Sequence, residues 1–238
     1  PWRKVFNLLR PDFMTQLHLP FKFLEQAAGP NVREPWLLVL MHGVGSNEQD
    51  LFGLARLMPP QFHVLSLRAP YVLSPDAYAW FEFEVLPDGE RRIDEEQERE
   101  SRFLVGEMID SAAQQLGVPP ERIVVGGFSQ GGIMALSLLL TKPESVRAAM
   151  VWHSRLLSQV VPHIAPPEAF EGKALWVSHG SADNVIPPSA AQVTRELART
   201  LPLALSGSDF PGAHEIRPAE LQGTLAWLQS LSASTGAP

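Results

Sequence analysis

The segment that decides the fold is "RIVVGGFSQGGIMALSLLL", residues 122–140. It begins with an apolar run rich in β-branched residues, which predicts a buried strand, and it ends with an apolar run that predicts a helix over 130–143. A lone serine, Ser129, stands between two pairs of glycines where strand and helix meet. This pattern predicts a tight turn in which glycine at 127 and 131 removes side chains that would clash. The alternative is a glycine-rich turn that only happens to contain serine.

Segments of the same two kinds alternate along the chain. Near-continuous apolar runs that end in Gly or Pro predict further strands, buried on both faces as in a parallel sheet, at 36–43, 62–70, 148–154 and 174–180. Helical patterns predict helices over 47–58, 93–117, 189–200 and 217–231. The alternation predicts an α/β fold with a mostly parallel central sheet and helices on both of its faces.

Length and composition narrow the class of protein. With 238 residues, 45% of them hydrophobic, the chain is expected to form a single domain over 1–238 with a core from about 17 to 230. A net charge of -7 argues against nucleic acid as a partner, and the absence of cysteine excludes disulfides and cysteine nucleophiles. No apolar run is long enough for a transmembrane helix. Residues 1–16 lack the pattern of a signal peptide, which favours a cytoplasmic location.

A serine nucleophile needs a base, and seven histidines compete for that role. His214 is favoured, because "FPGAHEIRPAE" places it in a Gly- and Pro-bounded loop after the last strand-like run and before the last helix. Sites in open α/β sheets form at the carboxyl ends of strands. His42 and His179 also follow predicted strands, but each directly precedes a glycine, which favours a turn-stabilising role for both.

The acid that orients the base is expected to be Asp183, which lies in the loop just beyond the strand predicted over 174–178. Asp209, five residues before His214, is the alternative acid. The order Ser129, Asp183, His214 is the nucleophile, acid, base order of α/β-hydrolases.

An oxyanion formed by attack on a carbonyl needs two backbone donors. One is expected to be the amide of Gln130, directly after the serine. The other is expected in the loop "MHGVGSNEQD" (41–50), where Gly43 and Gly45 permit a sharp turn and the amide of Val44 is the candidate.

Six motifs in this order resemble the carboxylesterase, lysophospholipase and acyl-protein thioesterase family of α/β-hydrolases: "MHGVGSNEQDLFGLA", "RAPY", "AWFEF", "GGFSQGGIMALSL", "HGSADNVIP" and "PGAHEI". The resemblance covers roughly residues 17–230. It implies a serine, acid and histidine triad of Ser129, Asp183 and His214, and an oxyanion hole from the amides of Val44 and Gln130. It also implies a small-molecule ester or thioester substrate.

The chain departs from the family pattern next to the expected site. It reads "WHSRLL" (152–157) where relatives commonly have the small residues "LSG", so Trp152 and His153 are expected on the wall of the substrate pocket. Residues 71–92 are expected to form a loop rich in aromatic residues, which offers Trp80 and Phe81 as further pocket residues. A pocket narrowed by Trp152 favours short acyl chains.

The sequence therefore predicts a serine carboxylesterase for short to medium acyl esters, with no metal, no organic cofactor and no large cap domain. Acyl-protein thioesterase and lysophospholipase activities are the alternatives within this family. A non-catalytic acyl-binding protein of the same fold is a further alternative. Exposed apolar surface around an open groove favours a homodimer.

Overall fold

The strands that sequence patterns predict form the centre of one mixed sheet in the computed structural model, which describes residues 17–87, 89 and 91–233. In this part of the chain the sheet has eight strands in the order β1-β3-β2-β8-β9-β10-β11, and β12 also pairs with β10. Only β1 runs antiparallel to its neighbour. Their bounds are β1 Phe23–Gln26, β2 Trp36–Met41, β3 Phe62–Leu67, β8 Ile123–Phe128, β9 Ala148–Trp152, β10 Ala174–Gly180, β11 Ala204–Ser206 and β12 Asp209–Phe210. The prediction for residues 1–16 lies outside the described residues.

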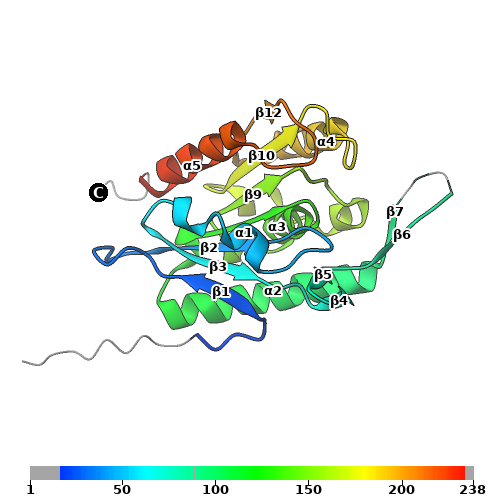
Figure 1. The fold of residues 1–238 in the computed structure, drawn as a ribbon. Helices are drawn as coiled ribbons and strands as arrows, with labels where there is room; N and C mark the ends of the chain where they lie inside the picture. Colours follow the sequence, from blue (N-terminus) through cyan, green and yellow to red (C-terminus); the bar gives the residue numbers. More distant parts are fainter. Residues whose placement is uncertain (1–16, 88, 90, 234–238) are drawn as a thin grey trace, which may run out of the picture.

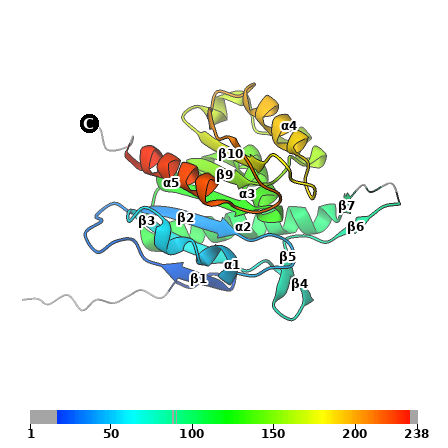
Figure 2. The same ribbon diagram turned by 45° about the horizontal axis from the view of Figure 1, so that its top comes forward.

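Helices cover both faces of the sheet (Figure 1). They are α1 Gln49–Phe52, α2 Glu95–Leu116, α3 Gln130–Thr141, α4 Pro188–Ala198 and α5 Pro218–Ala233. Residues of α2, α3 and α4 pack on one face, and residues of α1 and α5 pack on the other. A view from another angle separates the two layers (Figure 2). In the described part of the chain, no helix combines the length and hydrophobicity needed to cross a membrane.

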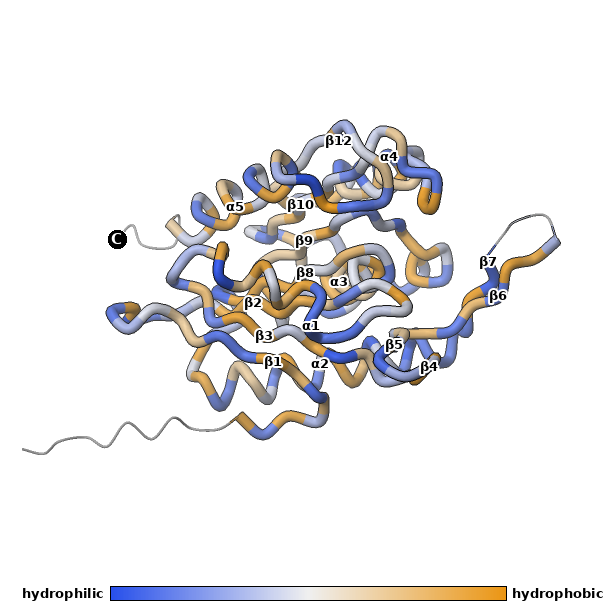
Figure 3. The backbone as a smooth tube through the Cα atoms, viewed as in Figure 1, coloured by the Kyte–Doolittle hydropathy of each residue, from blue (hydrophilic) through white to orange (hydrophobic). Residues whose placement is uncertain are grey.

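The two faces of the sheet explain why the central strands are apolar throughout. Along β2, Leu37, Val39 and Met41 face one core, while Leu38 and Leu40 face the other. The backbone tube is accordingly hydrophobic along β2 and β3 (Figure 3). Burying a leucine or methionine side chain stabilises the fold by about 1.5–3 kcal/mol. The buried side chains of these central strands therefore stabilise the middle of the sheet.

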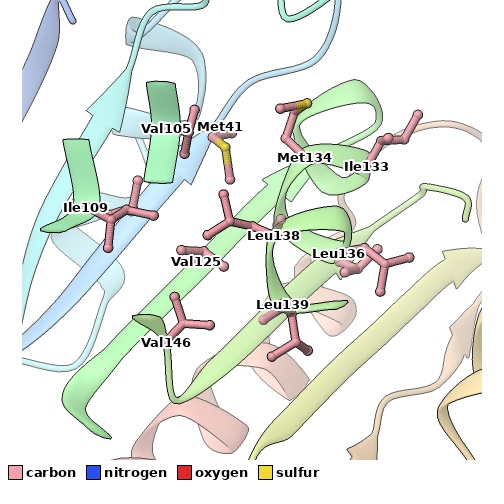
Figure 4. Packing of buried hydrophobic residues seen from close by; sticks show 14 of the residues in the cluster. Met41, Val105, Ile109, Val125, Ile133, Met134, Leu136, Leu138, Leu139 and Val146 are labelled. Carbon is pink, nitrogen blue, oxygen red and sulfur yellow. The ribbon is translucent and has the colours of Figure 1, made fainter. Parts of the chain in front are cut away.

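Helix α3 packs directly onto the central strands of the sheet. In the core beneath it, Met41 of β2 and Val125 of β8 lie close to Leu138 of α3 and to Val105 and Ile109 of α2 (Figure 4). Ser129 lies at the N-terminal end of α3, so this packing anchors the element that carries the serine.

The segment 71–92, expected as a loop, instead forms two hairpins. They are β4 Tyr71–Ser74 with β5 Ala77–Ala79, and β6 Phe83–Val85 with β7 Arg91–Ile93. The second hairpin extends away from the rest of the ribbon (Figure 1). The helix expected over 47–58 is also broken: α1 stops at Phe52, before Gly53, and a short 3₁₀ turn follows at Ala55–Leu57.

Candidate active site

Ser129 occupies a strained turn between β8 and α3. Its φ of 53° and ψ of -116° lie in a region that side chains rarely adopt. The glycines around it are required by close packing: a Cβ on Gly127 would lie 2.3 Å from the carbonyl carbon of Gly131, and a Cβ on Gly131 would lie 1.9 Å from the carbonyl oxygen of Met41. The turn therefore holds the Ser129 hydroxyl at the carboxyl edge of the sheet.

Three side chains from separate loops meet in series at this edge. His214 Nε2 lies 3.0 Å from Ser129 Oγ, and His214 Nδ1 lies 2.7 Å from Asp183 Oδ2. Because a carboxylate oxygen only accepts, Nδ1 donates to Asp183, which leaves Nε2 of a neutral imidazole free to accept the serine proton. Asp209, the alternative acid, instead pairs with Arg195 at 2.7 Å. This geometry is suited to removing a proton from a serine hydroxyl.

Asp183 is held as an anion by several donors. Its Oδ1 accepts hydrogen bonds from the amides of Val185 (2.9 Å) and Ile186 (3.0 Å), and its side chain is fully buried. Burial raises the pKa of Asp183, but hydrogen bonds from His214, Ile186, His153 and Val185 outweigh burial and lower the pKa to about 2. The carboxylate is therefore ionised wherever His214 acts as a base.

A second histidine, His153, contacts the same carboxylate. His153 Nδ1 lies 3.1 Å from Asp183 Oδ2, and its Nε2 lies 3.0 Å from Glu220 Oε2 in the first turn of α5. All three side chains are buried. Both ring nitrogens face carboxylates, so both donate and the ring is an imidazolium. Burial lowers the pKa of His153, but the bonds to Glu220 and Asp183 outweigh burial and raise the pKa above its ordinary value.

The buried pair of His153 and Glu220 is built into the sheet. His153 has a φ of 49°, and its amide donates to Ser178 of β10 at 3.0 Å. The missing side chain of Gly180 leaves room for the ring, because a Cβ there would lie 2.9 Å from His153 Cε1. Glu220 also accepts from the Ser178 hydroxyl at 2.6 Å. These contacts fix His153 against Asp183.

The turn roles expected for His42 and His179 are confirmed by their contacts. His42 accepts from the amide of Ala69 at 3.1 Å and donates from Nδ1 to the carbonyl of Gly43 at 2.8 Å. Burial lowers its pKa, so the ring is neutral. His179 donates from Nε2 to the carbonyl of Ile186 at 2.8 Å, which closes the turn around Asp183.

His153, His179 and Asp183 also lie close enough together to be candidate metal ligands. Both nitrogens of His153 are already engaged by carboxylates, and Asp183 Oδ2 already accepts from two imidazoles. A metal ion at this cluster would require His153 to release a proton and would compete with His214 for the carboxylate.

The two amides expected at an oxyanion hole border the cavity beside Ser129. Val44 and Gln130 both line it. In the described part of the chain, neither of their amides donates to another backbone carbonyl. The Gln130 amide is the first of α3, where N–H groups lack partners within the helix and the helix dipole favours negative charge. Both donors thus suit an anionic oxygen.

The Gln130 side chain has a separate role that sequence patterns did not reveal. Its Oε1 accepts from the amide of Trp80 at 2.8 Å, and its Nε2 donates to the carbonyl of Phe81 at 2.6 Å. The indole of Trp80 also donates to the carbonyl of His42 at 2.9 Å. Gln130 therefore clamps the segment before β6 against the turn that carries Ser129.

Of the expected pocket residues, Phe81 lines the cavity beside Ser129, whereas Trp80, Trp152 and His153 do not. Trp80 is fully buried beneath the loop that follows β2. Trp152 faces the opposite side of the sheet, where its indole donates to Thr224 at 3.0 Å. The expected narrowing of the pocket by Trp152 is therefore wrong: alternation along β9 turns the side chain away.

The phospholipase/carboxylesterase family model matches residues 25–232. The chain belongs to this family. A probable carboxylesterase of Oryza sativa subsp. japonica is 35% identical over 126 residues, which cover 52% of the chain and 46% of the relative. Acyl-protein thioesterase 1 of Gibberella zeae is 32% identical over 129 residues, covering 53% of each protein. The aligned region thus spans about half the length of these curated relatives.

Solved structures share the fold of this carboxylesterase family member. A Bacillus cereus carboxylesterase has a TM-score of 0.75 at 24% identity, covering 89% of the chain and 95% of its own. Acyl-protein thioesterase 2 of Zea mays has a TM-score of 0.73 at 20% identity, covering 89% and 99%. These likenesses establish the α/β-hydrolase fold, with its mostly parallel sheet.

Two residues of this carboxylesterase family member escaped sequence reasoning. Glu220 shares a helical face with Thr224, Leu228 and Leu231, all of them buried. An acidic residue at that spacing among apolar ones was the available signal of a buried partner. Arg155 follows β9 and lines the cavity beside Ser129, and no sequence pattern marks it.

Proposed function

We propose that this protein is a serine esterase that hydrolyses carboxylic esters through an acyl-enzyme. The observation that carries the proposal is the unbroken series of hydrogen bonds from Ser129 Oγ through His214 to Asp183, at 3.0 and 2.7 Å. Membership of a family with relatives named carboxylesterase supports the same reaction.

In the proposed first step, Ser129 Oγ attacks the ester carbonyl carbon while His214 Nε2 takes the hydroxyl proton. The carbonyl oxygen becomes an oxyanion and accepts hydrogen bonds from the amides of Val44 and Gln130. Asp183 keeps the imidazole oriented and stabilises the imidazolium. The tetrahedral intermediate then expels the alcohol, which takes the proton from His214, and leaves Ser129 acylated.

In the proposed second step, His214 takes a proton from water as the water oxygen attacks the acyl carbonyl. A second tetrahedral intermediate collapses, Ser129 Oγ leaves with the proton from His214, and the carboxylic acid is released. The same groups therefore serve both half-reactions.

A thioester is the second candidate substrate, because relatives of this chain are named acyl-protein thioesterases. The same attack and the same oxyanion donors apply to a thioester carbonyl. The cavity beside Ser129 is narrow and lined by Phe81, Ile133 and Ile186, which supports short to medium acyl chains. A series of 4-nitrophenyl esters from two to sixteen carbons, assayed beside one acyl thioester, tests both points; fastest turnover at sixteen carbons contradicts the short-chain proposal.

Labelling with a fluorophosphonate probe tests the proposed nucleophile. The parent protein is expected to be labelled and to hydrolyse 4-nitrophenyl butyrate, while Ser129→Ala is expected to remain unlabelled and to lose about 10⁴- to 10⁶-fold in turnover. The exposed Ser158 provides a matched control, since Ser158→Ala should behave as the parent. A parent protein that is neither labelled nor active would support the alternative of an acyl-binding protein.

A further inference from the structure

Two guanidinium groups border the narrow cavity beside Ser129. Arg155, in the loop after β9, and Arg91, at the start of β7, line it together with the nucleophilic serine. The rest of the wall is largely apolar, with Phe81, Phe83 and Ile186 as examples. A cavity for an uncharged acyl chain needs only the apolar part of this wall.

Arg155 is one of six arginines, among the 13 in the described part of the chain, that have no carboxylate within 4 Å. Seven others in that part of the chain lie within 3.7 Å of a carboxylate: Arg68, Arg92, Arg99, Arg102, Arg122, Arg195 and Arg217. Acidic residues are not scarce, since the chain has 26 of them and a net charge of -7. What distinguishes Arg155 is its position: it is a half-buried cation without a carboxylate partner that lines the cavity beside Ser129, where an anionic ligand can pair with it.

The surroundings of Arg155 favour the binding of an anion to its guanidinium. Burial lowers the pKa of its guanidinium, and the nearby charge of Arg91 lowers it further. A guanidinium nonetheless stays protonated in proteins, so Arg155 remains charged. Arg91 is turned toward an aromatic ring, with its Cζ 5.2 Å from the centre of Phe83. Two cations close together, one of them half-buried, form a site that attracts a carboxylate.

The lining of the cavity indicates which part of the substrate it receives. Val44 and Gln130, the proposed oxyanion donors, line it, whereas His214 is not among its lining residues. The leaving alcohol must depart close to His214, because it takes its proton from that ring. The cavity with the two arginines therefore lies on the acyl side of the ester.

We propose that Arg155, assisted by Arg91, binds a carboxylate at the far end of the acyl chain, so that the preferred substrates are monoesters of short dicarboxylic acids. This inference rests on the proposed esterase function. The planar guanidinium of Arg155 can donate two parallel hydrogen bonds to such a carboxylate. The chain length between ester and carboxylate then sets whether the carbonyl reaches Ser129.

The test compares monoethyl glutarate with ethyl valerate, which has the same five-carbon acyl chain without the terminal charge. Acid release is followed by titration at constant pH. The parent protein is expected to show about 10- to 100-fold higher kcat/KM for monoethyl glutarate. Arg155→Met should bring this ratio close to one, and Arg155→Lys should retain part of it. The exposed Arg199 supplies the charge-matched control, and Arg199→Met should leave the ratio unchanged.

A binding measurement makes the inference independent of turnover. Ser129→Ala protein should bind glutarate at least tenfold more tightly than valerate in calorimetric titration, and the double variant Ser129→Ala/Arg155→Met should not. Equal kcat/KM for the two esters, or equal affinity for the two acids, overturns the inference and leaves the esterase function standing. Absence of fluorophosphonate labelling in the parent overturns the esterase function instead.

Discussion

His153 Nδ1 lies 3.1 Å from Asp183 Oδ2, the same oxygen that accepts a hydrogen bond from His214 Nδ1. The proposed catalytic carboxylate thus contacts two imidazoles, and that of His153 is also paired with Glu220. The position of Asp183 is therefore fixed by the buried ion pair of His153 and Glu220, in addition to the backbone amides of its own turn.

Breaking that ion pair is expected to destabilise the fold. His153→Ser leaves Glu220 buried without a cation, and Glu220→Gln leaves His153 with one carboxylate fewer; each should lower the free energy of unfolding by about 3–5 kcal/mol. The double variant should cost less than the sum of the two, because it removes both members together. Urea denaturation measures all three. The exposed His163 serves as control, and a strictly additive double variant would refute the coupling.

Acid should weaken the fold through Asp183. Its folded-state pKa of about 2 lies below its ordinary value of 3.8, so its contribution is present above pH 4 and is lost as pH falls toward 2. The shift corresponds to about 2 kcal/mol. The gap in unfolding free energy between the parent and Asp183→Asn should therefore shrink by that amount between pH 5 and pH 2. Parallel curves over this range would show that Asp183 is not held as described.

Replacing Gln130 with methionine tests the clamp on Trp80 and Phe81. The substitution keeps the length of the side chain but leaves the amide of Trp80 and the carbonyl of Phe81 without their partner. A loss of about 1–3 kcal/mol in unfolding free energy is expected. Gln192→Met, on the exposed side of α4, should change it by less than about 0.5 kcal/mol. Similar losses for the two variants would contradict the clamp.

Glycine 131 should tolerate no side chain. In Gly131→Ala the new Cβ would lie 1.9 Å from the backbone oxygen of Met41, which cannot move without distorting β2. A loss of more than about 4 kcal/mol, or failure to fold, is expected. Gly53→Ala is the matched control, because its Cβ would meet Asp50 at an ordinary 3.6 Å. Thermal denaturation compares them, and a folded Gly131→Ala protein with the parent's melting temperature would disprove the close packing.

The sequence indicated the centre of the fold better than its periphery. The strands β2, β3, β8, β9 and β10 were predicted because each is a buried apolar run. The two hairpins within 71–92 were missed, since their strands have three or four residues and only Ala79 among them is buried, which leaves little periodicity to detect. β1 was missed for the same reason.

The candidate site was likewise predicted only in part. Ser129, Asp183 and His214 were predicted because each stands in a short motif next to a predicted strand or helix. His153 and Glu220 are 67 residues apart in the sequence, and they meet only because α5 packs on the sheet. Such pairing depends on which face a side chain takes, as the outward turn of Trp152 also shows. A single sequence does not show directly which face of the sheet a side chain takes.

The three triad residues come from loops that belong to different parts of the chain, with 85 residues between serine and histidine and 31 between histidine and aspartate. No local segment can assemble them, because β8, β9 and β10 must first pair in register. Contacts between such distant residues form late in folding. Recovery of the proposed esterase activity after dilution from denaturant should therefore report completion of the whole sheet, whereas helical circular dichroism is expected to return earlier.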